Sequence, residues 1–331
     1  MNEATTSKPE KSLPAATTEF TRSLLLTPGE DLLGYLAGHA GRLALFGITC
    51  ASVLAVLLIF VFVIKESIGF LTSYPLFDFL AKKSWYPEAD HPEFGALGII
   101  IGSVYVTVGA LVFAVPIGLL AAIFLSDIAP FQVQQIFKPV IEILAAIPSV
   151  AYGFFAVLVV APYLQEKFGF SAGTNALNAS MILAVMSLPT IISVSEDSLS
   201  AVGREIREAA YGLGSTRAET MIKVVIPAAH SGIIAAVILG MMRAIGETMV
   251  VLMASGKAYN NIPAPWWDLS QQISTITANI ASDMGEVAWG TQHYMSLFAL
   301  GVLLLVFTFT LNLVSEYFLS RIKKTAGGMG T

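Results

Sequence analysis

The chain alternates between long apolar runs and shorter polar connections. Six of the apolar runs are about 20 residues long, the length that an α-helix needs to cross the hydrocarbon core of a bilayer. They cover residues 43–64, 97–125, 139–162, 177–195, 232–254 and 295–319. This pattern predicts an all-α membrane protein with six transmembrane helices. Because the number of spans is even, both termini are expected on the same side of the membrane.

The composition agrees with this pattern. Of the 331 residues, 55% are hydrophobic and 12% are charged, whereas about a quarter of the residues in a soluble domain are charged. The mean hydropathy is +0.74. The sequence lacks the His-Glu-x-x-His and Gly-x-Ser-x-Gly motifs of hydrolases and the Gly-x-x-x-x-Gly-Lys-Ser/Thr loop that binds ATP. Since its four histidines are also scattered, we expect neither a catalytic site nor a metal site in this chain.

Basic residues are distributed unevenly among the connections, and cytoplasmic connections of membrane proteins are enriched in them. Five lie in the odd-numbered connections, whereas twelve lie in the terminal segments and in the second and fourth connections. The twelve are Lys8, Lys11, Arg22, Arg42, Lys138, Arg204, Arg207, Arg217, Lys223, Arg321, Lys323 and Lys324. This distribution predicts that both termini and the fourth connection are cytoplasmic. Residues 1–41, rich in Ser, Thr, Ala and Pro, are expected to form a flexible tail.

One basic residue, Arg243, falls near the middle of the fifth predicted span. An arginine there costs roughly 2.5–3.5 kcal/mol on insertion scales, and such residues face a bundle interior or a water-filled path. The guanidinium group matches two oxygens of a tetrahedral anion. Glu247 follows one helical turn later, on the same face of the expected helix. Two interpretations stay open: the pair neutralises itself and fixes helix packing, or Arg243 attracts an oxyanion in transit while Glu247 tunes that attraction.

The third predicted span contains a proline, Pro148, followed by Ser149 and Tyr152. A proline bends a helix and frees a backbone carbonyl. Ser149 is therefore a candidate residue of the substrate path. The alternative is a kinked packing helix whose hydroxyl groups are bonded internally.

Two further patterns concern packing. Small residues recur every fourth position in the fifth span, which predicts a narrow helix-contact ridge; they are Gly232, Ala236, Gly240, Ala244 and Thr248. In the external connection, 255–294, apolar residues follow Asp268 at helical spacing, and they are Leu269, Ile273, Ile276 and Ile280. This second pattern predicts an amphipathic helix that starts at Asp268 and lies on the outer surface of the bundle.

The fourth connection is rich in charged residues. Strong helix formers over 205–210 end near Gly212 and Gly214, and a second short helix is expected over 217–225, ended by Pro227. Two short helices joined by small residues form a projection suited to docking on another protein. Within this stretch Glu208, Ala209, Ala210, Gly214, Val224, Ile226 and Pro227 stand at the spacing of a known motif.

This motif resembles the EAA loop of the membrane subunits of ABC importers. The resemblance implies a type I importer permease fold (MetI-like), with a coupling loop over 203–227 that contacts a cytoplasmic ATPase through Glu208, Ala209, Ala210 and Gly214. It also implies that this chain has no catalytic site and that ATP and Mg are bound by the partner ATPase. The expected organisation is a tail (1–41), a first helix with an external loop (42–94), a permease core (95–320) and a C-terminal tail (321–331).

Three segments, 144–155, 187–199 and 243–256, are similar to phosphate permease subunits of the PstC type, and the similarity covers about residues 95–320. The PstA type reads Gly-Glu-Thr-Ala-Pro-Leu where this chain continues from Glu247 with Thr-Met-Val-Val. The resemblance implies a PstA-like second permease subunit, two PstB-like ATPases and an external PstS-like binding protein, with phosphate as substrate, a bacterial cytoplasmic membrane as location and no nucleic acid. A sulfate or molybdate permease, which shares Arg-x-x-Gly-Glu, and an ion-gradient-driven transporter remain alternatives.

Overall fold

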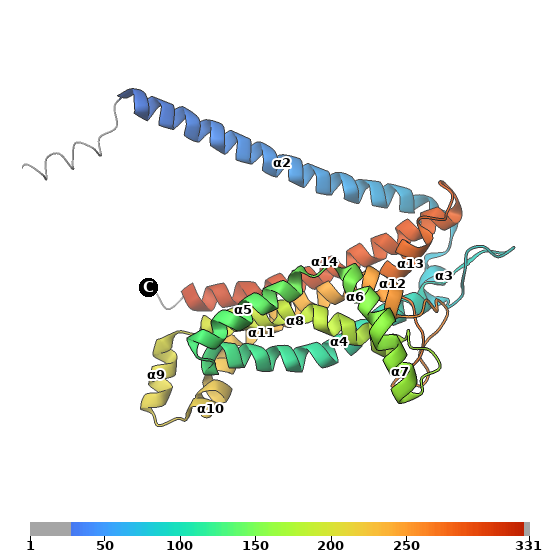
Figure 1. Cartoon of the computed structure of the whole chain (residues 1–331). Coiled ribbons are helices and arrows are strands. Elements are labelled where there is room, and N and C mark those ends of the chain that lie inside the picture. Colours follow the sequence, from blue (N-terminus) through green and yellow to red (C-terminus); the bar gives the residue numbers. More distant parts are fainter. Residues whose placement is uncertain (1–27, 328–331) are drawn as a thin grey trace, which may run out of the picture. The chain divides into compact units, whose positions relative to one another are not determined.

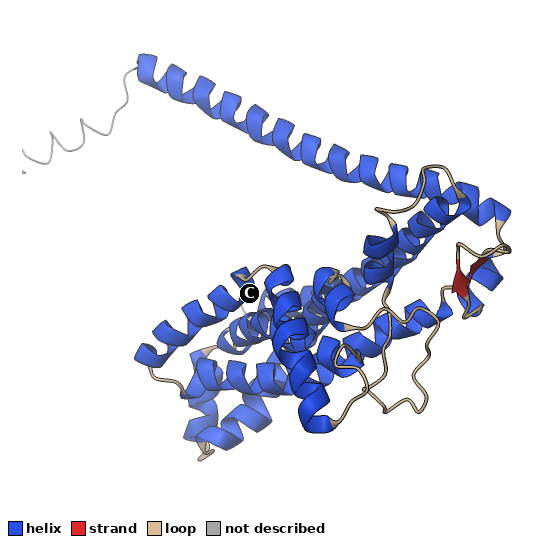
Figure 2. Cartoon of the chain, turned by 45° about the vertical axis from the view of Figure 1, so that its right-hand side comes forward, coloured by secondary structure: helices blue, strands red, loops and turns tan. Residues whose placement is uncertain are grey.

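The computed structural model of this chain describes residues 28–327, with side chains over residues 38–317. Its internal contacts divide the chain into two compact units, residues 1–62 and residues 63–331. The described elements are α2 (Pro28–Ser73), α3 (Leu76–Ala81), β1 (Trp85–Tyr86), β2 (Glu93–Phe94), α4 (Leu97–Ile123), η1 (Phe124–Ile128), α5 (Phe131–Ala146), α6 (Ser149–Phe155), η2 (Ala156–Val160), α7 (Ala161–Phe168), α8 (Ala176–Ser200), α9 (Arg204–Gly212), α10 (Arg217–Thr220), η3 (Met221–Val225), α11 (Ile226–Ile245), α12 (Met249–Ala254), α13 (Ile276–Asp283) and α14 (Gln292–Gly327). Figure 2 shows that helices dominate these residues and that β1 and β2 form one small hairpin.

Six stretches of helix are long and apolar enough to cross a membrane, which confirms the predicted fold class. They are Gly38–Ser73, Leu97–Ile128, Ser149–Phe168, Ala176–Ser200, Arg217–Ile245 and Gln292–Tyr317. In the first part of the chain, residues 38–62 of α2 are exposed within this chain, so their apolar surface is suited to lipid. Because α2 begins at Pro28, residues 28–41 are helical rather than part of a tail. The predicted tail at 1–27 lies outside the described residues.

The third predicted span, 139–162, is wrong at its start. α5 ends at Ala146, and Ile147 and Pro148 have extended backbones with ψ angles of 128° and 137°. Proline lacks an N–H donor, and its ring disfavours helical geometry in the residue before it. The spanning helix therefore starts at Ser149 and continues through α6, η2 and α7 to Phe168.

The fifth predicted span, 232–254, is wrong at both ends. The helix already begins at Arg217 and passes Pro227 without a break, because η3 is wider than an α-helix and the Ile226 N–H bonds to the carbonyl of Met221. Because a π-helical turn departs from the bonding of each N–H to the carbonyl four residues earlier, it accommodates proline, which has no N–H donor. At the other end, the helix stops at Ile245, and α12 begins only at Met249.

The external connection does not carry the predicted surface helix from Asp268. The described helix, α13, begins at Ile276, and its N-cap is Thr275, whose side chain accepts from the Ala278 N–H. Residues 273–279 are buried, so this apolar stripe faces the bundle interior. Asp268 instead accepts hydrogen bonds from Ser270 and Gln271, which lower the pKa of its carboxyl group.

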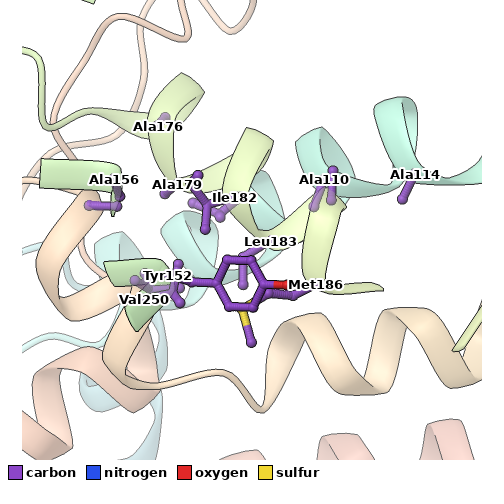
Figure 3. Close-up of a cluster of buried hydrophobic side chains, with 14 of the residues drawn as sticks. Ala110, Ala114, Tyr152, Ala156, Ala176, Ala179, Ile182, Leu183, Met186 and Val250 are labelled. Atoms are coloured by element: carbon purple, nitrogen blue, oxygen red, sulfur yellow. The ribbon is translucent and has the colours of Figure 1, made fainter. Parts of the chain in front are cut away.

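Small residues form the core of the second part, where α4 packs along α8, and α11 packs against both α8 and α14. Figure 3 shows Ala110 and Ala114 of α4 close to the α8 residues of one buried cluster. The predicted ridge of α11 is confirmed as a contact surface, since Gly232, Ala236, Gly240 and Ala244 are all buried. Thr248 lies beyond the helix and is half-buried.

We expect Gly240→Ala to destabilise the protein. The buried side chain of Ile191 packs between Gly240 on α11 and Gly118 on α4. A methyl group added at Gly240 therefore collides with Ile191. Overpacking of this kind costs about 1–3 kcal/mol, against a helix-propensity gain of about 1 kcal/mol. The measurement is thermal unfolding in detergent. Gly285→Ala, where the added methyl meets no atom, is the matched control, and Gly240→Ala should cost less in an Ile191→Ala background than in the unaltered protein. An equal cost of Gly240→Ala in both backgrounds contradicts the packing argument.

Candidate functional site

Arg243 lies two residues before the end of α11. Its Nε donates a hydrogen bond of 3.2 Å to the carbonyl oxygen of Met186. Met186 is the eleventh residue of the 25-residue helix α8, so the guanidinium group is level with the middle of a neighbouring span. Arg243 is nevertheless exposed on the surface of this chain. Arg243 therefore lies at the predicted mid-span depth, and its side chain reaches a surface there because α11 ends two residues later.

Glu247 lies in the break between α11 and α12, not one turn further along a continuous helix as predicted. Within residues 38–317, no ion pair joins Glu247 to Arg243. The backbone carbonyl of Glu247 accepts a 2.8 Å hydrogen bond from Thr277 Oγ1. α11 ends here because Gly246 is a weak helix former. Thr277, in the buried segment 273–279, donates to the Glu247 carbonyl in place of a hydrogen bond within the helix.

A narrow crevice lies beside this break. Glu247 lines it together with hydroxyl-bearing residues of two other segments, namely Ser103 and Thr107 of α4 and Thr275 and Thr277. The Ser103 hydroxyl accepts a 2.8 Å hydrogen bond from the Ile276 N–H, which fixes the buried segment to α4. The polar residues around Glu247 therefore come from three parts of the chain, and the α4 residues are more than 100 positions away from the others in the sequence.

Ser149 is the first residue of α6 and is half-buried. α6 packs against α12, the helix that follows the break. The described residues contain no hydrogen bond from Ser149 to Arg243 or Glu247. Tyr152 is a packing residue, because it belongs to the buried cluster with Met186 and Val250 (Figure 3) and its hydroxyl donates a 3.0 Å bond back to the Leu144 carbonyl. This bond connects the two sides of the Pro148 break.

The projection predicted from the fourth connection is confirmed at one end of the bundle, where α9 and α10 lie (Figure 1). The predicted end of its second helix at Pro227 is wrong, because α10 opens the helix that continues through η3 into α11. Glu208 and Ala209 are exposed, whereas Ala210 is buried and faces the body of the protein. Gly214 has a φ angle of +87°, a left-handed conformation that favours glycine over other residues. Thr216 and Glu219 then form a capping box that starts α10.

An arginine of α9 that the sequence did not single out as a site residue fastens this projection to two spans. The Arg207 guanidinium forms an ion pair with Asp127 at the end of η1. It also donates to the carbonyl oxygens of Leu199, at 2.7 Å, and Val202. The side chains of Arg207 and Asp127 are only 13% and 15% exposed. α9 is therefore connected to both the second and the fourth spans through one side chain.

Nothing in the sequence indicated this pair. Asp127 and Arg207 are 80 residues apart, and each reads as an ordinary charge in a polar connection between apolar runs. A second cross-connection, Lys138 Nζ to Glu196 at 3.1 Å, joins α5 to α8 in the same way. Such pairs depend on which helix ends meet in space, and spacing along the chain does not contain that information.

Comparison with known sequences gives a consistent result. The sequence profile described as binding-protein-dependent transport system inner membrane component matches residues 114–324. A probable ABC transporter permease protein, YqgH, of Bacillus subtilis is 37% identical over 246 residues, which cover 74% of this chain and 78% of that protein. The phosphate transport system permease protein PstC of Mesorhizobium japonicum is 36% identical over 270 residues, covering 76% of this chain and 80% of that protein.

A further similar relative is PstC of Pasteurella multocida, which is 33% identical and covers 76% of this chain and 82% of that protein. Among solved structures, the inward-facing MetNI methionine ABC transporter aligns with a TM-score of 0.51 and 17% identity. This alignment covers 67% of the chain and 93% of the solved one. At that identity it supports the fold alone.

Proposed function

Because this chain belongs to the family of binding-protein-dependent transport system inner membrane components, we propose that it is the permease subunit of an ATP-driven ABC importer for inorganic phosphate. Relatives named as phosphate transport permeases support this substrate. The structural observation that carries the proposal is Arg243, a guanidinium group exposed at mid-span depth beside a helix break. An arginine at this depth is costly unless it faces a polar path.

Exposure of Arg243 in this chain also supports a second permease subunit. When a path runs between two subunits, the residues that line it are exposed on the surface of each separate subunit. We propose a homologous PstA-like partner on this side, two PstB-like ATPases that bind ATP and Mg, and an external PstS-like phosphate-binding protein. The distribution of basic residues supports placing both termini and α9–α10 in the cytoplasm of a bacterial cell.

The exposed residues of the coupling loop support contact with the ATPase. Glu208 and Ala209 are available on α9, and Gly214 shapes the turn that follows. Ala210 is buried on the inner side, so its role is to let α9 pack closely against the body of the permease. Movement of the ATPases is transmitted from α9 to η1 and α8 through Arg207.

Glu247 acts on the transported anion without forming a contact pair with Arg243. A carboxylate near the site weakens the attraction for an anion, and weak binding is what a transit site requires for release. It also accepts a hydrogen bond from a protonated phosphate oxygen, which sulfate lacks at neutral pH. Ser149, at the start of α6, lines the path on the side of α12.

The substrate is tested by ATP hydrolysis in the complete transporter reconstituted with its external binding protein. We expect phosphate to stimulate hydrolysis, and sulfate and molybdate to leave it near the basal rate. Equal or greater stimulation by sulfate or molybdate contradicts phosphate as substrate. Uptake that continues under an ion gradient when the ATPase is disabled contradicts the ABC mechanism altogether.

A further inference from the structure

A polar pocket of about 590 Å³ lies beside α9, and the proposed transport path does not use it. Its walls include Ser126 near the end of η1, Ser200 at the end of α8, and the first residues of α9 and α10. Three arginines line it, namely Arg204, Arg207 and Arg217. The pocket therefore lies where two spans end, and it gathers basic side chains from three points of the fourth connection.

Two of these arginines are available to a ligand. Arg207 is already engaged by Asp127 and by the Leu199 carbonyl. Arg204 and Arg217 are exposed, and within the described residues neither makes an ion pair or a side-chain hydrogen bond. Because Arg207 neutralises Asp127, Glu208 is the lining carboxylate that remains, and the two available arginines leave the pocket net positive.

The start of α9 adds to this field. Its N-cap is Gly203, which provides no side chain to bond the first backbone N–H groups. The N-terminal end of a helix carries a partial positive charge, and its free N–H groups are suited to an anion. Arg204 is the first residue of this helix, so the guanidinium and the uncapped helix end lie at the same pocket wall.

Apart from Glu208, which borders both, the pocket faces a different side of α9 from the surface proposed to contact the ATPase. Arg204, Glu208 and Tyr211 line the pocket, and they share one helix face because their spacing is four and three residues. Ala209 is exposed on another face, and Leu213, just after the helix, is 88% exposed. An ATPase bound over Ala209 and Leu213 leaves the Arg204 face available.

We propose that this pocket binds a phosphate group, held by Arg204 and Arg217. Guanidinium groups are well matched to phosphate oxygens. Two sources of this group are suited to a pocket at the cytoplasmic ends of membrane spans: free inorganic phosphate and the headgroup of an anionic phospholipid. The inference rests on the orientation proposed above, and it does not depend on which anion is transported.

The test uses the complete purified transporter carrying Arg243→Gln, so that the proposed path site does not contribute to binding. In one arm, thermal unfolding is measured with inorganic phosphate against sodium chloride at equal ionic strength. In the other, native mass spectrometry counts phosphatidylglycerol retained after extraction from phosphatidylglycerol vesicles, with phosphatidylcholine vesicles as comparison. Arg204→Gln and Arg217→Gln are each tested, and Lys223→Gln is the matched control because Lys223 is basic, exposed and outside the pocket.

A phosphate-dependent stabilisation that is weakened about tenfold in apparent affinity by either Gln variant, and not by Lys223→Gln, identifies free phosphate as the ligand. Retained phosphatidylglycerol that is lost in the same two variants identifies the lipid headgroup. The charge-conserving Arg204→Lys and Arg217→Lys variants should keep most of the binding, which separates a charge effect from misfolding. Binding in neither arm, or binding unchanged in both Gln variants, overturns the proposal. Because the assay requires no transport, either result leaves the proposed function to its own test.

Discussion

Arg243→Gln is expected to reduce phosphate uptake by about 10- to 100-fold while the transporter still assembles. The substitution removes the positive charge and the forked donor group, and a hydrogen bond to a charged group contributes about 1.5–3 kcal/mol. Assembly should survive, because Arg243 is exposed in this chain and its bond to the Met186 carbonyl is a single 3.2 Å contact. The measurement is uptake of radiolabelled phosphate into vesicles that contain the complete transporter.

Two further variants define the role of this arginine. Arg243→Lys keeps the charge and loses the fork, so it should retain an intermediate rate. Glu247→Gln removes both the repulsion of the anion and the charged hydrogen-bond acceptor, so it should raise the apparent affinity for phosphate if loss of the repulsion has the larger effect and lower it if loss of the acceptor has. Normal uptake by both Arg243→Gln and Glu247→Gln in assembled transporter contradicts the assignment of this site.

Arg207→Met is expected to destabilise the junction between α9 and the spans by about 3 kcal/mol, because it leaves the Asp127 carboxylate buried without its partner. Basal ATP hydrolysis by the ATPases should persist, whereas its stimulation by phosphate and the binding protein should fall sharply. Thermal unfolding measures the first effect and stimulated hydrolysis measures the second. Lys223→Met, on the exposed surface of the same connection, is the control.

The double variant Arg207→Met with Asp127→Leu sharpens this test. Replacing both partners of a buried ion pair by apolar residues is often neutral for stability. We therefore expect the double variant to recover most of the stability lost in Arg207→Met, yet to stay poorly coupled, since the bonds to Leu199 and Val202 are also lost. Full recovery of stimulated hydrolysis indicates that the junction needs only apolar contact and rules out a specific role for the ion pair.

The sequence predicted the six spans and the α9–α10 projection because these depend on local properties. A run of 20 apolar residues forms a helix in a bilayer wherever it occurs, since the backbone has no other way to satisfy its hydrogen bonds there. The small-residue ridge of α11 belongs to the same class. Its four-residue spacing requires a close neighbour, and α8 supplies one through Ile191.

Two predictions failed at segments that form hydrogen bonds with other parts of the chain. The apolar stripe of the external connection has helical spacing, but its residues 273–279 are buried and bond to Ser103 and Glu247. Hydropathy cannot distinguish an apolar face on the outside of a bundle from one inside it. The prediction that Glu247 lies one helical turn after Arg243 was wrong because α11 ends at Ile245, although the apolar run continues to Ala254.

By itself, the sequence determined that this protein lies in a membrane with six helices, that a charged helical loop with Glu208 and Gly214 projects between two of them, and that a costly arginine lies within its fifth apolar run. These follow from transfer energies and backbone bonding, which act over a few neighbouring residues. The tertiary structure alone decided that Arg243 reaches a surface at mid-depth, that Glu247 lies apart from it among hydroxyl groups, and that Arg207 fastens α9 to Asp127. These depend on which helix ends meet, and contacts between residues 30 to 80 positions apart are set by packing of the whole bundle.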